Sequence, residues 1–491
     1  MKSTIPLLLI SLFLATSCGP KAEKYSLDWK RSFPALGTNS SLKCTDLNGD
    51  GILDVVIGAG KNEFQQSDSA VIALDGKDGK VLWAVGGKDQ MVGSATFLDI
   101  NGDQTDDIII GGRSAQLLAL NGKNGEEIWQ FQKNEFQGHA GKYLQYNFFN
   151  AQLIPDQDED GLEDLLVVNG GNVNAAPDSE KDRYAGVLAV MSSASGKVLA
   201  ADTMPDGKET YMSPLLYEFR EGEGLKVIFG TGGETIAGSL YMIGLEDLMN
   251  SDISGAIALY KEAEHGYIAP PLLADINKDG TKEIISISHN GRYGVHDSET
   301  GSLLNSHVFQ GLEANTSPGP GYFNEDDYLD VFLSLSEGVW PKNTGQKQFI
   351  MSGKDGKILW EDNRGCFGFS SPLSYDVDGD GFQEAIWAVN EYNCEGLYAA
   401  DGFHYLLYKD LNHAREEIMS PKIPGKNVAT TPWLGDLDGD GLLDILYCVQ
   451  ANTSVTHQYF GFMIVRSKTQ IPISSTGNWG QYMGPNGKSV Y

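Results

Sequence analysis

The chain has 491 residues and a formal net charge of −30, because 66 acidic side chains outnumber 36 basic ones. This charge balance argues against nucleic acid as a partner, since nucleic-acid binding proteins present basic surfaces to phosphates. A chain of this length often forms two or three domains, but the internal repeats described below predict one repetitive domain instead.

The first residues have the composition of an export signal. Lys2 precedes a short apolar run at 5–14, which is too short to span a bilayer stably. The sequence Ala15-Thr16-Ser17-Cys18 resembles a bacterial lipobox. That resemblance implies a signal peptide at 1–17, lipidation of Cys18 and a tether at 18–24. It predicts a protein held to the outer membrane by its lipid anchor, on the periplasmic or cell-surface side; an ordinary signal peptide with a chance cysteine is the alternative.

Four further cysteines lie at 44, 366, 394 and 448, and none are adjacent. Disulfides are typical of exported proteins with an even number of cysteines. A bond between Cys366 and Cys394 would lie within one repeat, and a bond between Cys44 and Cys448 would join the chain ends.

An acidic nine-residue loop, followed at once by an apolar strand, recurs along the chain. Six copies carry Asp, Asn or Glu at positions 1, 3, 5 and 9, and five of them have Gly at position 6, where the copy at 99 has Gln104. Calcium prefers six to eight oxygen ligands, and glycine permits the tight turn that brings them together. The alternative is a set of metal-free turns. The predicted calcium ligands are Asp46, Asn48, Asp50, Asp54, Asp99, Asn101, Asp103, Asp107, Asp156, Asp158, Asp160, Asp164, Asp275, Asn277, Asp279, Glu283, Asp376, Asp378, Asp380, Glu384, Asp436, Asp438, Asp440 and Asp444.

Two more copies are eroded. One begins at Tyr322 and keeps Asp326 and Asp330. The other begins at Glu218, and its Arg220 and Lys226 predict that it binds no metal.

A second repeat alternates with the acidic loops. Segments 73–83, 119–129 and 350–360 each contain an Asp/Asn/Ser-Gly-Lys turn and end on Trp83, Trp129 or Trp360. Each segment is predicted to form a β-hairpin whose tryptophan packs between sheets.

Together the two repeats predict a four-stranded unit of about 55 residues, which is typical of a β-propeller blade. Loop starts at 46, 99, 156, 218, 275, 322, 376 and 436 predict an all-β fold at 25–491 with eight blades; seven is the alternative. The last unit lacks an outer strand, and the segment around Trp29 matches the one around Trp83. Residues 25–33 are therefore predicted to complete the last blade and close the ring.

The acidic loops resemble FG-GAP (integrin-α-type) repeats, and the hairpins resemble the tryptophan-docking motifs of PQQ-like (quinoprotein-like) propellers. The tail from Trp479, with Gly484-Pro485-Asn486-Gly487, resembles a segment of the latter. Quinoprotein dehydrogenases also need adjacent cysteines, which this chain lacks, so no PQQ is expected.

Strand order places the acidic loops and hairpin turns on one face of the ring and the long insertions on the other. Variable insertions on one face of a repeat ring usually mark the binding face. The aromatic residues predicted to contact a protein or glycan there are Tyr143, Tyr146, Tyr184, Tyr211, Tyr267, Trp340 and Tyr392.

These observations predict a non-enzymatic, calcium-stabilised outer-membrane lipoprotein that acts as a binding or scaffold module, with no catalytic residues assigned. The alternative is a calcium-dependent polysaccharide lyase. That enzyme would need a basic cluster on the insertion face, for which Lys142, Arg183, Arg292 and Arg364 are the candidates.

Overall fold

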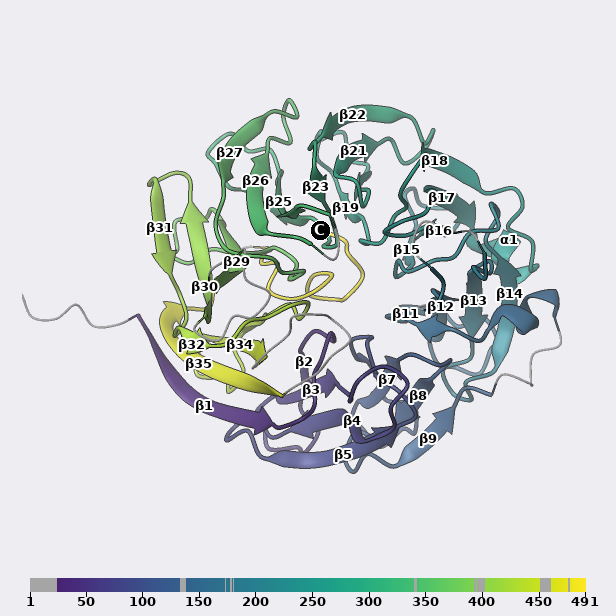
Figure 1. The fold of residues 1–491 in the computed structure, drawn as a ribbon, viewed down its shortest axis with the longest axis horizontal. Helices are drawn as coiled ribbons and strands as arrows, with labels where there is room; N and C mark the ends of the chain where they lie inside the picture. The colour runs from purple at the N-terminus through teal and green to yellow at the C-terminus, as the bar shows by residue number, and fades with distance from the viewer. Residues whose placement is uncertain are drawn as a thin grey trace, which may run out of the picture.

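The computed structural model describes residues 24–132, 138–172, 174–176, 179, 181–339, 342–392, 394, 402–450, 461–475 and 477–491. Eight antiparallel sheets stand around a central axis (Figure 1). The prediction of an eight-bladed β-propeller is therefore confirmed. The predicted signal peptide 1–17, Cys18 and Trp340 lie outside the described residues.

Each blade runs from an inner strand at the axis to an outer strand at the rim. The first four blades are formed, in that order, by β2 (Lys43–Thr45), β3 (Asp54–Gly58), β4 (Ser67–Leu74) and β5 (Val81–Gly87); β6 (Thr96–Leu98), β7 (Asp107–Gly111), β8 (Leu117–Leu120) and β9 (Glu127–Gln130); β11 (Gln152–Ile154), β12 (Asp164–Gly170), β13 (Val187–Met191) and β14 (Val198–Thr203), with β10 (Asn147–Phe148) also on β12; and β15 (Leu215–Tyr217), β16 (Lys226–Gly230), β17 (Gly238–Gly244) and β18 (Ile257–Glu262). Helix α1 (Leu245–Met249) replaces the hairpin turn of the fourth blade, and the 3-10 helix η1 (His139–Tyr143) precedes the third.

The remaining blades repeat this order. They are formed by β19 (Leu272–Ala274), β20 (Glu283–Ile287), β21 (Arg292–His296) and β22 (Leu303–Val308); β24 (Gly319–Gly321), β25 (Asp330–Glu337), β26 (Gly345–Met351) and β27 (Ile358–Asp362), with β23 (Leu312–Glu313) also on β25; β28 (Leu373–Tyr375), β29 (Glu384–Glu391), β30 (Phe403–Asp410) and β31 (Arg415–Ile418), with β32 (Ile423–Pro424) also on β30; and β33 (Trp433–Gly435), β34 (Leu442–Gln450), β35 (Phe462–Pro472) and β1 (Tyr25–Phe33).

The N-terminal strand closes the ring, as predicted. Strand β1 pairs antiparallel with β35, so the eighth blade contains both ends of the propeller (Figure 1). Closure leaves no unpaired edge between first and last blade, which removes a site of edge-to-edge aggregation.

Tryptophans on the outer strands dock each blade onto the next. The indole Nε1 of Trp29 donates to Gly76 O at 2.9 Å, and that of Trp83 donates to Gly122 O at 2.7 Å. Gly125 lies in the receiving turn with a φ of +74°, and a Cβ there would lie 2.8 Å from the Trp83 ring. The predicted inter-sheet role of these tryptophans is therefore confirmed.

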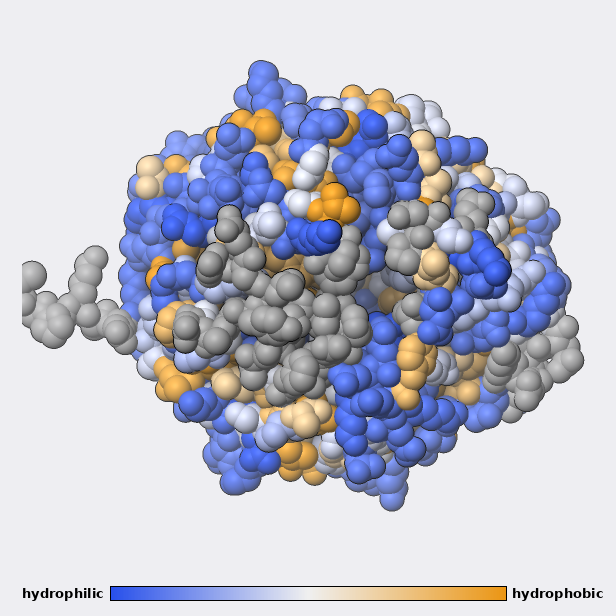
Figure 2. Space-filling model, in the orientation of Figure 1, coloured by the Kyte–Doolittle hydropathy of each residue, from blue (hydrophilic) through white to orange (hydrophobic). Residues whose placement is uncertain are grey.

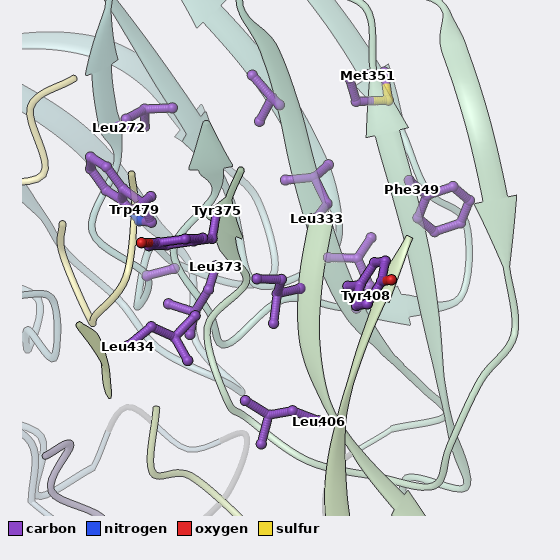
Figure 3. Close-up of a cluster of buried hydrophobic side chains, with 14 of the residues drawn as sticks. Leu272, Leu333, Phe349, Met351, Leu373, Tyr375, Leu406, Tyr408, Leu434 and Trp479 are labelled. Carbon is purple, nitrogen blue, oxygen red and sulfur yellow. The ribbon is translucent and has the colours of Figure 1, made fainter. Parts of the chain in front are cut away.

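The C-terminal tail crosses the centre of the ring. Trp479 is buried, exchanges backbone hydrogen bonds with Ser374, and lies beside Tyr375, Leu373 and Leu434 (Figure 3). Further along, Leu273 N donates to Ser489 O at 2.9 Å. The tail thus contacts the inner strands of several blades and fills the axis behind the insertion face.

Cysteine pairing agrees with one prediction and corrects the other. Cys366 and Cys394 form a disulfide. Cys44 and Cys448 are both free, so the predicted bond between the chain ends is wrong. Ring closure rests on β1 pairing with β35 instead. In the described part of the chain no helix has the length and apolar character needed to cross a membrane.

Candidate functional site

The acidic loops lie together with the hairpin turns on one face of the ring. The position-9 carboxylates of the first, second and sixth blades (Asp54, Asp107 and Asp330) accept a hydrogen bond from the backbone of the hairpin turn: Gly76 N donates to Asp54 Oδ1 at 3.0 Å, and the glycines of the other two turns donate equivalently. Position 1 accepts from the loop itself, as Gly51 N donates to Asp46 Oδ2 at 3.0 Å. The loops are therefore held in shape by their own carboxylates.

Position 3 divides the loops into two kinds. Where it is asparagine, the side-chain amide donates to the position-9 carboxylate: Asn101 Nδ2 lies 3.2 Å from Asp107 Oδ1, and Asn277 Nδ2 lies 2.8 Å from Glu283 Oε1. Where it is aspartate, no such donor exists. The carboxylate oxygens of positions 1, 3 and 9 then converge to within 4.8 Å of one another, in the loops at 156, 376 and 436.

In two of these three aspartate loops, basic side chains form ion pairs with the carboxylates and so offset their negative charge. Arg466 is 2% exposed, and its Nη2 donates to Asp438 at 2.6 Å and to Asp444 at 2.9 Å; Lys468 Nζ also contacts Asp438 at 2.6 Å. In the loop at 376, Arg415 pairs with Asp378. These cations occupy part of the space that a metal ion would need.

The loop at 156–164 has no such partner. Among the described residues, no lysine, arginine or histidine forms an ion pair with Asp156, Asp158 or Asp164. Asp164 is fully buried, its Oδ2 accepts from Gln157 N at 2.6 Å, and its Oδ1 lacks a hydrogen-bond partner. Burial raises the pKa of Asp164 to about 6. This donor set fits a hard cation such as Ca²⁺, which would satisfy the buried oxygen.

A cavity of about 750 Å³ lies at the axis on the opposite, insertion-rich face. The space-filling view down the axis shows a recess near the centre of the ring (Figure 2). Its wall is formed by the connections that lead into the inner strands and by the loops between the two middle strands. Five asparagines, six serines and threonines, and the rings of Phe149, Tyr211 and Phe369 line it. Tyr482 of the tail lines it too, and burial raises the pKa of its hydroxyl to about 12.

Hydroxyl and amide side chains form a hydrogen-bonded belt around this cavity. Moving from blade to blade, Ser371 N donates to Thr431 Oγ1 at 3.1 Å, and Thr431 N donates to Ser41 Oγ at 3.1 Å. Ser41 N then donates to Ser94 Oγ at 3.0 Å. A hydroxyl that accepts a belt bond keeps its own hydrogen for a further partner. Two of these four belt residues, Ser371 and Thr431, directly precede a proline in the sequence.

The charged groups of the cavity wall fall into two sets. Arg113 Nη2 pairs with Glu63 at 2.7 Å, and Arg183 pairs with the buried Glu209, which also accepts from Tyr211 OH at 3.0 Å. The second set lies on the fourth to sixth blades. It consists of two glutamates, Glu234 and Glu313, and two histidines, His265 and His289.

The aromatic residues that were predicted to contact a ligand lie at different places in the structure. Tyr211 lines the axial cavity. Tyr143, Tyr146 and Tyr184 form a cluster beside it, with the Tyr146 and Tyr184 rings stacked at 6.0 Å. Tyr267 is 1% exposed and Tyr392 lies over Lys426, 5.4 Å from its Nζ. Burial of Tyr267 in the core removes it as a contact residue, which corrects that prediction.

The four basic candidates do not form one cluster. Arg183 faces the axial cavity but is paired with Glu209, Arg292 pairs with Glu262 and Arg364 pairs with Glu416. Lys142 lies over the Tyr143 ring. The carboxylate-binding cluster that a polysaccharide lyase would need is absent from these four residues.

The sequence predictions missed the polar lining of the cavity. Asn39, Asn150 and Asn315 come from different blades and meet only because the fold brings the connections to the axis. The available signal was the small polar residue that recurs before most inner strands, and this pattern alone did not distinguish a ligand contact from tight packing.

Comparison with known proteins agrees with this architecture. A family model described as the FAM234A/B beta-propeller matches residues 29–243. The chain is similar to the FAM234A/B β-propellers. Human FAM234B is 25% identical over 434 residues, covering 80% of this chain and 63% of the human protein. The chain thus spans less than two thirds of the length of the curated relatives it matches.

Solved structures share the fold alone at their low identities. A quinohemoprotein alcohol dehydrogenase from Comamonas testosteroni aligns with a TM-score of 0.55 at 13% identity, covering 94% of this chain and 79% of that chain. A europium-containing methanol dehydrogenase aligns with a TM-score of 0.53 at 12% identity, covering 90% and 93%. The chain therefore shares its propeller fold with these two dehydrogenases over most of its length.

The predicted function and location need correction. The curated relatives are FAM234B proteins of human, mouse and chicken, which are eukaryotic proteins and not bacterial outer-membrane lipoproteins. The outer-membrane localisation and the lipoprotein function built on the Ala15–Cys18 resemblance are therefore wrong. A four-residue motif after a short apolar run carries too little information to assign a compartment.

Proposed function

We propose that the propeller is a binding domain that takes a saccharide in its axial cavity. The observation that carries this proposal is the hydroxyl and amide belt, which lines a cavity of about 750 Å³. Small-molecule sites commonly have volumes of roughly 300–1,000 Å³.

The chemistry of the lining supports a polyhydroxylated ligand. Asn39 and Asn315 line the cavity, and their buried Oδ1 and Nδ2 atoms have no hydrogen-bond partner among the described residues, so one acceptor and one donor can bind a ligand or water. Phe149 and Phe369 offer apolar surfaces against which a sugar ring can pack.

Saturation-transfer NMR with a panel of oligosaccharides tests the proposal. Ala429 lines the cavity and is half-buried, so Ala429→Trp should block the site and abolish the saturation transfer. Ala84→Trp is the matched control, because Ala84 is exposed on the outer strand β5. The proposal fails if no saccharide gives a signal, or if both variants bind equally well.

We also propose that the loop at 156–164 binds calcium and stabilises the third blade. The converging carboxylates of Asp156, Asp158 and Asp164, together with the unpartnered Asp164 Oδ1, support this second role. When bound, the ion would neutralise these groups; Asp156 and Asp160 would keep the loop shaped through their bonds to Gly161 N and Leu162 N. The other predicted loops remain predictions.

Metal analysis of paired variants tests the calcium proposal. Asp158→Asn should reduce the bound calcium by one ion per chain and remove part of the stabilisation by calcium. Asp438→Asn, in the loop already balanced by Arg466 and Lys468, should leave the calcium content unchanged. Equal losses in both variants would show that the basic side chains do not decide which loop binds metal.

A further inference from the structure

One side of the axial cavity gathers hydrogen-bond acceptors. Glu234 from the β16–β17 loop, His265 from the connection after β18 and Glu313 of β23 line it, with His289 beside them. The ring centroids of His265 and His289 are 5.5 Å apart, and His289 Nε2 lies 3.6 Å from Glu313 Oε1. Four titratable side chains from three blades thus meet at one wall.

Both imidazoles are oriented by backbone carbonyls. His289 Nδ1 lies 3.2 Å from Ala314 O, and His265 Nδ1 lies 2.5 Å from Glu234 O. A carbonyl oxygen only accepts, so each Nδ1 carries a hydrogen; Nε2 is then an acceptor in a neutral ring and a donor in a protonated ring. His289 is 1% exposed, and its Nε2 has no hydrogen-bond partner. This buried nitrogen faces the Glu313 carboxylate without a hydrogen bond between them, and in the neutral ring a donor placed between the two groups would satisfy both.

The two arginines of the cavity are already paired, Arg113 with Glu63 and Arg183 with Glu209. No lysine or arginine of the described residues forms an ion pair with Glu234, and burial raises the pKa of that carboxyl group. The Glu313 carboxylate accepts a hydrogen bond from Asn343 Nδ2 at 2.9 Å and lies 3.6 Å from His289 Nε2.

Resting on the proposed saccharide site, we propose that the ligand carries a protonated amine, as in an amino sugar, and that this amine binds between Glu234, Glu313 and His289. An ammonium group offers three donors and one positive charge, which match two carboxylates and the Nε2 acceptor of a neutral imidazole. The belt on the other side of the cavity then receives the hydroxyl groups of the sugar.

A directly coordinated metal ion fits this wall less well. The groups of acidic and histidine side chains whose ligand atoms come within 4.8 Å of one another all lie at the acidic loops or their hairpin turns, among the residues that the structure describes. The cavity wall is not among them. Hydrogen bonds from an ammonium group, or from the water around it, tolerate wider spacing than metal coordination does.

A matched pair of trisaccharides tests the inference by calorimetry on the full chain. Chitotriose carries three amines, and its tri-N-acetylated form has the same sugar rings without the charge. Chitotriose should bind the wild type roughly ten-fold more tightly or better, and Glu234→Gln should remove that preference. Glu223→Gln, an exposed carboxylate on the acidic-loop face, is the control and should change nothing.

The outcomes separate the inference from the function on which it rests. Equal binding of the two trisaccharides, or an unchanged preference in Glu234→Gln, overturns the amine assignment and leaves the saccharide site intact. Binding of neither sugar, together with silence of the whole saccharide panel, overturns the proposed function itself. Binding of Zn²⁺ that both Glu234→Gln and His289→Gln abolish would replace the amine by a metal.

Discussion

Replacing Arg466 by methionine should destabilise the propeller in a way that calcium repairs. Arg466 lies on β35, and its guanidinium contacts Asp438, Asp444 and Asp28 of the eighth blade. Its Nη1 also donates to Gly76 O of the first blade at 3.2 Å. Methionine keeps the volume of the buried stem but removes the charge and these hydrogen bonds.

The magnitude follows from burial. Arg466 is 2% exposed and Asp444 is 3% exposed, so the variant leaves a buried carboxylate without its partner. Breaking a buried pair in this way costs about 3–5 kcal/mol of unfolding free energy. Without Arg466 the loop has the same carboxylates at positions 1, 3, 5 and 9 as the loop at 156–164, with Lys468 as the remaining basic neighbour. With a dissociation constant of roughly 10⁻⁴ M and about 10 mM calcium, binding would return about 2.7 kcal/mol.

Denaturant unfolding of wild type and variant, each in EDTA and in calcium, measures both effects. Because the 156–164 loop is expected to bind calcium in both proteins, the informative quantity is the difference in unfolding free energy between variant and wild type. This difference should be smaller in calcium than in EDTA. It should shrink further when Lys468→Met is combined with Arg466→Met. A difference that stays the same in EDTA and calcium would refute the idea that Arg466 takes the place of an ion.

Three further perturbations follow from packing, protonation and the disulfide. Gly125→Ala should lower the unfolding free energy by about 1–3 kcal/mol more than Gly311→Ala, because both glycines have a similar positive φ but only Gly125 touches Trp83; equal losses in thermal melts would count against tryptophan docking. Burial lowers the pKa of His404 to about 3, so the unfolded state binds more protons below about pH 6.5 and stability falls as the pH drops. His404→Gln should remove about 2 kcal/mol of that fall between pH 7.5 and 5, and parallel stability curves for the two proteins would contradict this assignment. Cys366→Ser should cost roughly 3–4 kcal/mol by opening the loop closed by Cys394, with no further loss on adding reductant.

The fold was largely predictable because each blade repeats local signals. The match between the segments around Trp29 and Trp83 was enough to place β1 in the last blade, since the docking of an outer-strand tryptophan depends on a few neighbouring residues. Cys366 and Cys394 could be paired for the same reason, as both belong to one blade.

Whether a basic side chain pairs with the carboxylates of an acidic loop could not be predicted from the sequence of that loop. Asp438 and Asp158 occupy equivalent positions, yet Arg466 reaches Asp438 from a strand that follows it by 28 residues. Such a contact depends on the register of β34 against β35. The grouping of Glu234, His289 and Glu313 at one wall of the axial cavity could not be predicted either, because three separate blades supply these residues.

A crystal structure grown with chitotriose would test the central claim most directly. The account predicts density for the sugar in the axial cavity, with an amine beside Glu234 and hydroxyl groups against Ser41 and Thr431 of the belt. Density for the sugar only on the outer strands or on the acidic-loop face, with the axial cavity holding water, would contradict it.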